Sequence, residues 1–502
     1  MKSEILLGAS AVSAALLCCA APGRALAQSA SGSDQAQALE EIVVTARQKS
    51  ENLESSPVAV TAINEMALRA MIPEDLRDIG RYAPNVSIGA IPGFRAAAIS
   101  IRGVSTGDIP ASFDPSIGVA VDGVFVGAAQ SALLDAFDLD NIQILRGPQG
   151  TLFGKNTIGG VVVVTTKRPT GNLDADADVR LGNYGRADFR GSVDFPIIDD
   201  VLSGRVAILS QNSDGYSRDA KTGQGLGGDD LVAGRAKLLY KPDDSLTALL
   251  SFDFDHDRSG TPPVVNTTPA GSAFYFLGFT DPLADRGTLN PLGDPHVTGQ
   301  VPNTAHTGIE APEHDFDIWG TTANIDYVTD FGTLTSITGF RYDRSKLYND
   351  YFGEDIPLYA TQRQVNRATT SEELRFAGKV TDRFDYVVGV YYQNNNFYYT
   401  NHTSLGPVFT GAPVPVGLIA LGSQDDNSYA VFGEGDTHIT DDLKLVTGVR
   451  YSYEEKTFTL QPLGLPTAFP NSDSWHNVAF RVGPQYDFSQ DIHGYVTFST
   501  GF

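Results

Sequence analysis

The residues that could carry acid–base or metal chemistry do not gather into a motif along this sequence. The eight histidines are scattered and form no H-E-x-x-H pattern. Asp253, Asp255 and Asp257 have the spacing that opens a calcium loop, but Arg258 stands where that loop needs a glycine and no distal glutamate follows at the required spacing. We interpret the three acids as inward-facing groups at the end of a strand. The sequence predicts no catalytic residues, no metal site and no cofactor.

A glycine-rich stretch, residues 141–169, divides the chain into two parts with different patterns. Its glycines allow tight turns and close backbone approach. Residues 161–164 are four consecutive valines, a β-branched run that favours a strand. Gly154 and Gly159 lack the Lys-Ser/Thr that must follow in a phosphate-binding loop. The stretch therefore predicts a turn and a strand, and no nucleotide site.

Composition and the first residues favour an exported, β-rich protein. The chain has 502 residues and a formal net charge of −24, which argues against nucleic-acid binding. Residues 1–27 have the positive start, the apolar core and the Ala25-Leu26-Ala27 cleavage pattern of a signal peptide. Both cysteines, Cys18 and Cys19, lie inside it, so a mature chain would contain none. Lipid attachment at Cys18 is the alternative, disfavoured by the leucines before it.

Residues 53–168 show a mixed α+β pattern. Asn64 is a plausible cap for a helix, and residues 73–80 predict a second helix that stops before Pro84. A helical turn is expected at residues 133–137. Strands are expected at residues 58–63, 99–103, 119–125 and 142–145.

Beyond residue 169 the pattern changes to long runs in which apolar and polar residues alternate. Residues 443–454 and 246–255 show this period of two, which predicts strands with one apolar face. The runs are roughly twice as long as the 5–6 residues usual in soluble sandwiches, and match the roughly 9–11 residues of tilted membrane strands. We count about thirteen such runs between Leu173 and Phe502, joined by alternately short and long connections. The pattern predicts a transmembrane antiparallel β-barrel.

Residues 144–154, Ile-Leu-Arg-Gly-Pro-Gln-Gly-Thr-Leu-Phe-Gly, resemble the end of the plug domain of TonB-dependent outer-membrane receptors. The elements before them match the family's plug in order, so the resemblance covers about residues 40–169. It implies a plug domain at residues 53–169 and a barrel from residue 170 onward, of the 22-stranded family. It also implies a place in the outer membrane, in contact with lipid and lipopolysaccharide. The implied activity is uptake of a scarce ligand, in this family usually an iron–siderophore complex, with iron present only as cargo.

A short β-prone run at residues 40–47 lies within a polar segment, residues 28–52, that is expected to be disordered. In this position the run resembles a TonB box, which would pair as an added strand with the energy-coupling protein TonB. Taken alone, it could be a stray edge strand. The distance from Ala27 leaves no room for a signalling domain, so we expect a transporter and not a transducer. The residues predicted to bind TonB are Glu41, Ile42, Val43, Val44, Thr45 and Ala46.

The resemblance also suggests where the plug is held and where ligand binds. Arg102 and Arg146 match plug arginines that pair with barrel-wall glutamates, here Glu373 and Glu434. The alternative is that these four are unrelated charges in the lumen. The plug's apical loops would touch ligand, or be solvated tips with no contact. The candidates on these loops are Phe94, Arg95, Asp108 and Phe113.

Three other functions remain open from the sequence. One is a passive porin or adhesion barrel, for which residues 41–46 would be dispensable. Another is TonB-dependent uptake of a different ligand, such as cobalamin, haem, nickel or a glycan. A soluble secreted β-enzyme is the third. Phe502 could be a terminal assembly residue, but we expect a chain truncated within the barrel, because unpaired strand edges in lipid are very costly.

Overall fold

The computed structural model describes residues 43–44, 47–49, 51–90, 97–105, 112–127, 132, 135–219, 223–260, 304–305, 314–350, 359–405, 416–462, 468–489 and 492–502. Ile42–Phe502 forms one unit. The predicted signal peptide lies outside the described residues, as do Glu41, Ile42, Thr45 and Ala46 of the predicted TonB box. Neither helix in the described part is long and apolar enough to cross a membrane.

Two short helices begin where a side chain can cap the first turn. Asn64 caps α1 (Glu65–Met71), as expected, by accepting a hydrogen bond from the Ala67 amide. The second predicted helix starts later than residue 73. Asp75 is in an extended conformation and caps α2 (Leu76–Gly80), so the segment before it cannot be helical.

The N-terminal region contains small sheets packed on two apolar clusters, one large and one small. The five-stranded sheet has the order β3 (Val60–Asn64), β9 (Leu139–Arg146), β10 (Gly160–Thr166), β7 (Ile117–Val121) and β8 (Val124–Phe125). β10 pairs with β7 in parallel and with β9 antiparallel. A second sheet contains β4 (Val86–Ala90), β5 (Ala97–Ile101) and β6 (Val104–Ser105). Ile79, Ile101, Ile142 and Ile144 are fully buried between these elements.

One expectation for this region was wrong, and another falls partly outside the described residues. The single strand expected at residues 119–125 is a hairpin, because Asp122 and Gly123 have φ of 49° and 89° and reverse the chain. Of the expected turn at residues 133–137, Leu133 and Leu134 lie outside the described residues. Asp135 forms an isolated bridge with Asp75.

A hairpin precedes this region. β1 (Val43–Val44) pairs antiparallel with β2 (Glu51–Asn52), and Val43 lies opposite Asn52. Two residues of the predicted TonB box therefore form a strand within the chain itself. Arg47, Gln48 and Lys49 occupy the connection between the two strands.

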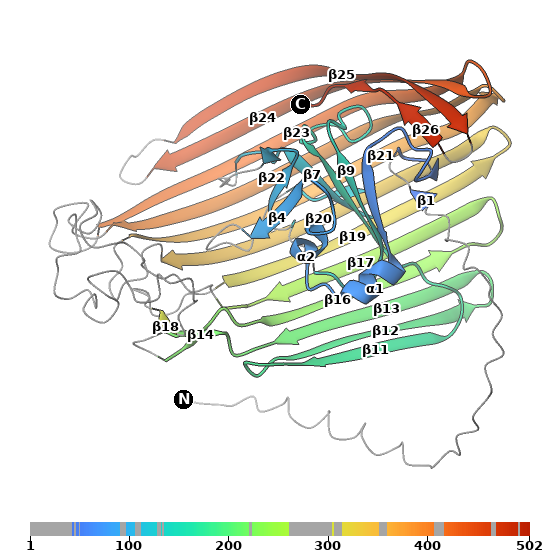
Figure 1. The fold of residues 1–502 in the computed structure, drawn as a ribbon. Coiled ribbons are helices and arrows are strands. Elements are labelled where there is room, and N and C mark those ends of the chain that lie inside the picture. Colours follow the sequence, from blue (N-terminus) through green and yellow to red (C-terminus); the bar gives the residue numbers. More distant parts are fainter. Residues whose placement is uncertain are drawn as a thin grey trace, which may run out of the picture. The chain divides into compact units, whose positions relative to one another are not determined.

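The large sheet has 14 antiparallel strands, thirteen in one path in sequence order and β27 paired with β25 (Figure 1). This confirms the expected series of about thirteen strands. The strands are β11 (Asp174–Leu181), β12 (Ala187–Ile198), β13 (Leu202–Asn212), β16 (Asp230–Tyr240), β17 (Leu246–Asp257), β19 (His314–Thr329), β20 (Gly332–Asp350), β21 (Tyr359–Thr381), β22 (Phe384–Leu405), β23 (Val416–His438), β24 (Leu443–Pro462), β25 (Phe469–Ser489), β26 (Ile492–Tyr495) and β27 (Phe498–Ser499). A separate small sheet contains β14 (Ser217–Asp219), β15 (Gly225–Leu226) and β18 (Thr304–Ala305).

The two faces of the large sheet are inverted relative to those of a soluble protein. Apolar side chains are exposed on one face, as at Leu250, Val390 and Val449, which are 51%, 51% and 54% exposed. Charged side chains such as Glu434 and Arg450 are buried on the other face. An exposed apolar band and a polar interior are expected of a barrel in lipid. The N-terminal region packs against the polar face, where Phe137 and Leu152 contact buried apolar side chains of the strands.

Candidate functional site

The candidate functional site is the contact between the N-terminal region and the polar face of the large sheet. Ion pairs join the two at points spread over several strands. Removing one partner of a buried ion pair is strongly destabilising, because the other charge is then buried without a partner. The site is therefore suited to holding the N-terminal region against the sheet.

Arg47, in the β1–β2 connection, is the most deeply buried of these cations. Its Nε donates to Oε1 of Glu434 at 2.7 Å, and its Nη1 and Nη2 donate to the two oxygens of Asp436 at 3.0 and 2.5 Å. All three side chains are 1% exposed. Burial alone would lower the pKa of the Arg47 guanidinium, but the attraction of Glu434 and Asp436 outweighs it and raises the pKa above the usual value.

The residues beside Arg47 attach the same connection to neighbouring strands. Lys49 also pairs with Asp436 on β23. The Gln48 amide donates to the Leu152 carbonyl and accepts a hydrogen bond from Arg375 on β21. The hairpin is thus held by three consecutive residues, directly after the residues predicted to bind TonB.

A second attachment lies at the Asp122 turn between β7 and β8. Asp122 accepts hydrogen bonds from the Thr166 amide and hydroxyl at 2.9 and 2.5 Å and pairs with Lys237 of β16 at 3.1 Å. Burial would raise the pKa of the Asp122 carboxyl, but Lys237 and Thr166 lower it overall. The positive φ of Asp122 places the carboxylate where both partners can reach it.

A third attachment lies near the start of β9. Asp138 pairs with Arg205 of β13 at 2.6 Å, and both side chains are almost fully buried. The neighbouring Phe137 packs under the Arg235 guanidinium, 4.3 Å from the ring centre, and its carbonyl accepts a hydrogen bond from that guanidinium. This attachment is therefore both ionic and apolar.

A fourth attachment joins the glycine-rich stretch to β23 and β24. Lys155 pairs with Asp426 at 2.8 Å and with Glu454 at 3.4 Å. Asp114, from the loop before β7, binds Lys456 nearby. Burial would lower the pKa of the Lys155 ammonium, but the three surrounding carboxylates raise it overall.

The pairing expected from the sequence, Arg102 and Arg146 with Glu373 and Glu434, was wrong. No ion pair joins either arginine to either glutamate within the described residues. Arg146 instead donates to the Pro84 carbonyl at 3.3 Å, and Arg102 is exposed in a turn with φ of 53°. The physical reason is that both arginines are held beside the N-terminal region's own residues 84–85. The Arg146 side chain donates to the Pro84 carbonyl, and the Arg102 backbone amide donates to the Asn85 carbonyl at 2.9 Å.

The two glutamates are on the polar face, as expected, but have other partners. Glu434 is bound by Arg47 and by Arg481 of β25, whose guanidinium also donates to Gln149 at 2.7 Å. Glu373 pairs with Arg375 on its own strand at 2.6 Å. Sequence reasoning missed Arg47, although its place next to the predicted TonB box was a usable indication.

The predicted ligand contacts are only partly described. Phe94, Arg95 and Asp108 lie outside the described residues. Phe113 is 65% exposed and precedes Asp114, which is held by Lys456. A large aromatic ring is therefore presented to solvent by an anchored loop.

Ser105 completes a G-x-S-x-G pattern at residues 103–107 that would suggest a hydrolase nucleophile. In hydrolases that serine sits on a sharp turn between a strand and a helix. Here Ser105 lies in strand β6 and pairs with Ser100 of β5. The geometry is that of a hairpin, and it gives no support to nucleophilic chemistry.

Comparison with known families decides which class this architecture belongs to. The TonB-dependent receptor plug domain profile matches residues 52–161, and the TonB-dependent receptor-like β-barrel profile matches residues 251–502, about half of the chain. The chain belongs to the TonB-dependent receptor family. The N-terminal region is the plug domain, the large sheet is barrel wall, and the family consists of non-enzymatic transporters of the outer membrane.

Several receptors of other bacteria are similar over most of this chain. The pesticin receptor of Yersinia pestis is 29% identical and that of Yersinia enterocolitica 23% identical, each over 92% of this chain. The chain spans 63% of the length of these relatives.

Solved structures show the same fold. The ferric yersiniabactin uptake receptor of Yersinia pestis superimposes with a TM-score of 0.72 at 20% identity, covering 88% of this chain and 64% of that one. The siderophore receptor PiuA of Acinetobacter baumannii superimposes with a TM-score of 0.71 at 14% identity, covering 89% and 65% of the two chains.

Proposed function

We propose that this receptor takes up a scarce ligand across the outer membrane, using energy delivered by TonB, and that the ligand is an iron–siderophore complex. The observation that carries the proposal is the attachment of the β1–β2 hairpin. Buried ion pairs tie Arg47 and Lys49, which follow the residues predicted to bind TonB, to the barrel wall. A force applied to the predicted TonB box would reach these ion pairs before any other contact of the plug.

The predicted TonB box itself is compatible with strand addition. Val43 and Val44 are paired to β2 on one edge. A strand has two edges, so a partner strand could add to the second edge or replace β2. We propose that Glu41 to Ala46 are the residues that TonB binds, and that residues 1–27 direct export.

The choice of an iron–siderophore complex rests on similar proteins. The similar chains include a ferric yersiniabactin uptake receptor and a ferrioxamine receptor of Yersinia enterocolitica, the latter 24% identical over 56% of this chain. Similarity is also found to vitamin B12 transporters, over 36% of this chain. We propose that exposed Phe113 contacts the ligand, together with Phe94, Arg95 and Asp108.

Deletion of residues 41–46 tests energy coupling. The protein is expressed in its outer membrane in cells lacking their own iron receptors, and uptake of radioactive iron is measured with hydroxamate, catecholate and phenolate siderophores. We expect the deletion to abolish uptake, while a deletion of equal length at residues 29–34 leaves it intact. Equal uptake by both variants would favour a passive barrel.

A binding measurement separates ligand identity from coupling. The same iron complexes, cobalamin and haem are titrated onto the purified receptor, with and without Phe113→Ala. We expect one siderophore class to bind and this substitution to weaken it. Met66→Ala, at another exposed apolar residue of the plug, is the control. Binding of cobalamin or haem alone would contradict the siderophore proposal and leave energy coupling intact.

A further inference from the structure

A cluster of three potential metal ligands lies on the outer face of the barrel wall, away from the plug. His256 near the end of β17 faces Asp317 of the adjacent strand β19, and Asp315 lies two residues before Asp317, near the start of β19. His256 shares its face with exposed Phe252 and Phe254, and the two aspartates share theirs with exposed Trp319. The cluster therefore lies just beyond the aromatic residues of the apolar face, at the end where β17 leads into the connection of residues 258–313.

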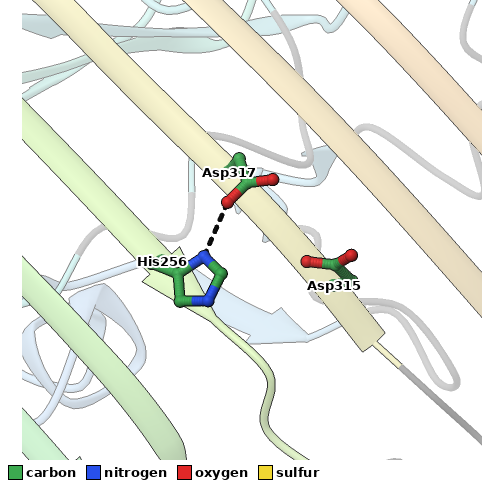
Figure 2. Close-up of side chains that lie close together, drawn as sticks. All are labelled: His256, Asp315 and Asp317. Carbon is green, nitrogen blue, oxygen red and sulfur yellow. Dashed lines mark hydrogen bonds and ion pairs between the residues drawn. The ribbon is translucent and has the colours of Figure 1, made fainter. Parts of the chain in front are cut away.

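The three side chains are close enough to bind one ion. His256 Nδ1 lies 2.6 Å from Oδ1 of Asp317 (Figure 2). One ligand atom from each residue lies within 4.8 Å of the other two, and all three residues are half-buried. Figure 2 shows the Asp315 carboxylate directed toward the same space from β19. Imidazole nitrogen and carboxylate oxygen together are a donor set that suits Zn²⁺.

Ion pairing with Arg344 of β20 does not account for the whole cluster. Its Nη2 lies 3.4 Å from Oδ2 of Asp315, and its Nη1 lies 3.5 Å from Oδ2 of Asp317. Both distances exceed the roughly 2.7–2.9 Å of strong charge-assisted hydrogen bonds. The arginine therefore makes one long hydrogen bond, to Asp315, and a long ion pair with Asp317, and its side chain is 42% exposed.

One oxygen of the cluster is left without a partner. Oδ1 of Asp315 is buried and accepts no hydrogen bond from the described residues. A buried carboxylate oxygen without a donor is costly and is uncommon in native structures. A cation between Asp315 and His256 would satisfy this oxygen and link β17 to β19.

We propose that His256, Asp315 and Asp317 bind a divalent cation of the zinc class on the outer rim of the barrel. The ion takes the place of the proton shared by His256 and Asp317, and a water completes its coordination. By joining two strands that are 61 residues apart at the His256–Asp317 pair, it stabilises the sheet where the long connection leaves. The site is independent of the ligand that the receptor transports.

Zinc titration of the purified receptor tests the proposal. The protein is extracted from outer membranes, stripped with chelator and titrated with Zn²⁺ by calorimetry, with the visible spectrum of Co²⁺ as a second readout. We expect His256→Gln and Asp317→Asn each to weaken binding at least tenfold, the lower end of the roughly 10–100-fold loss that even outer-shell changes cause. Circular dichroism confirms that each variant is folded.

Two matched variants make the test specific. Arg344→Gln removes the cation that competes for the carboxylates, so we expect it to tighten Zn²⁺ binding. His476→Gln changes an exposed histidine on β25 that forms no hydrogen bond within the described residues, and should leave binding unchanged. Equal binding by wild type and His256→Gln, or binding of Mg²⁺ in preference to Zn²⁺, would overturn the proposal.

Discussion

Replacing Arg47 by glutamine should release the β1–β2 hairpin from the barrel wall. The substitution removes hydrogen bonds of 2.7, 3.0 and 2.5 Å and leaves Glu434 and Asp436 buried with one cation fewer. Removing one partner of a buried ion pair costs about 3–5 kcal/mol. Lys49 and Arg481 remain beside the two carboxylates, so we take the lower end, about 3 kcal/mol.

Hydrogen exchange measured by mass spectrometry reports this release directly. A loss of about 3 kcal/mol corresponds to roughly a hundredfold larger population of the released hairpin, since about 1.4 kcal/mol is a factor of ten. We expect amides in peptides covering residues 43–52 to exchange faster by about that factor. Peptides from the barrel strands should exchange as in the wild type.

Arg69→Gln is the matched control for the same charge change. Arg69 is 59% exposed and pairs with Glu65 within helix α1. Exposed pairs of this kind contribute at most about 1 kcal/mol. If the hairpin exchanges equally slowly in Arg47→Gln and Arg69→Gln, the buried ion pairs do not hold it, and the reasoning behind the proposed function fails with them.

Three further substitutions test the contacts inside the plug and one of its attachments to the wall. Arg146→Gln should destabilise the plug by no more than about 1 kcal/mol, because it loses one hydrogen bond to a carbonyl. If chemical unfolding shows a loss as large as that of Arg47→Gln, Arg146 is paired with a buried glutamate, as the sequence first suggested. Asp122→Asn breaks a buried pair and should cost about 3 kcal/mol. Since the pKa of Asp122 is lowered on folding, wild type should keep this stabilisation above about pH 4 and lose it as pH falls through the lowered pKa. Proteolysis of the plug between neutral and acidic pH should therefore show less pH dependence in the variant than in the wild type. Gly160 has φ of 151°, and a Cβ there would lie 2.2 Å from the Leu145 carbonyl oxygen. Gly160→Val should therefore lower the plug's free energy of unfolding by about 1–3 kcal/mol or more, measured by thermal unfolding. Gly89→Ala, which has open space around it, should leave this free energy unchanged.

Local chemistry in the sequence was sufficient to predict most elements. The Asn64 cap, the valine strand after Gly160 and the alternating runs of the barrel all appear close to their expected places. The errors have local causes as well. Asp122 and Gly123 were predicted to continue a strand, although Asp-Gly pairs tolerate the positive φ of a turn. Asp75 stopped the second helix from starting at Pro73.

The sequence by itself determined the class of protein, because alternation, capping and glycine turns depend on neighbouring residues. The tertiary structure alone decided which charges meet. Glu434 lies on the wall as expected, but the plug-side cation that reaches it is Arg47, 387 residues away along the chain, and not Arg146. His256 and Asp317 likewise came together only through the register of two strands on either side of a long connection. Partner choice depends on strand register and on the path of distant loops, and no local pattern in the chain encodes either.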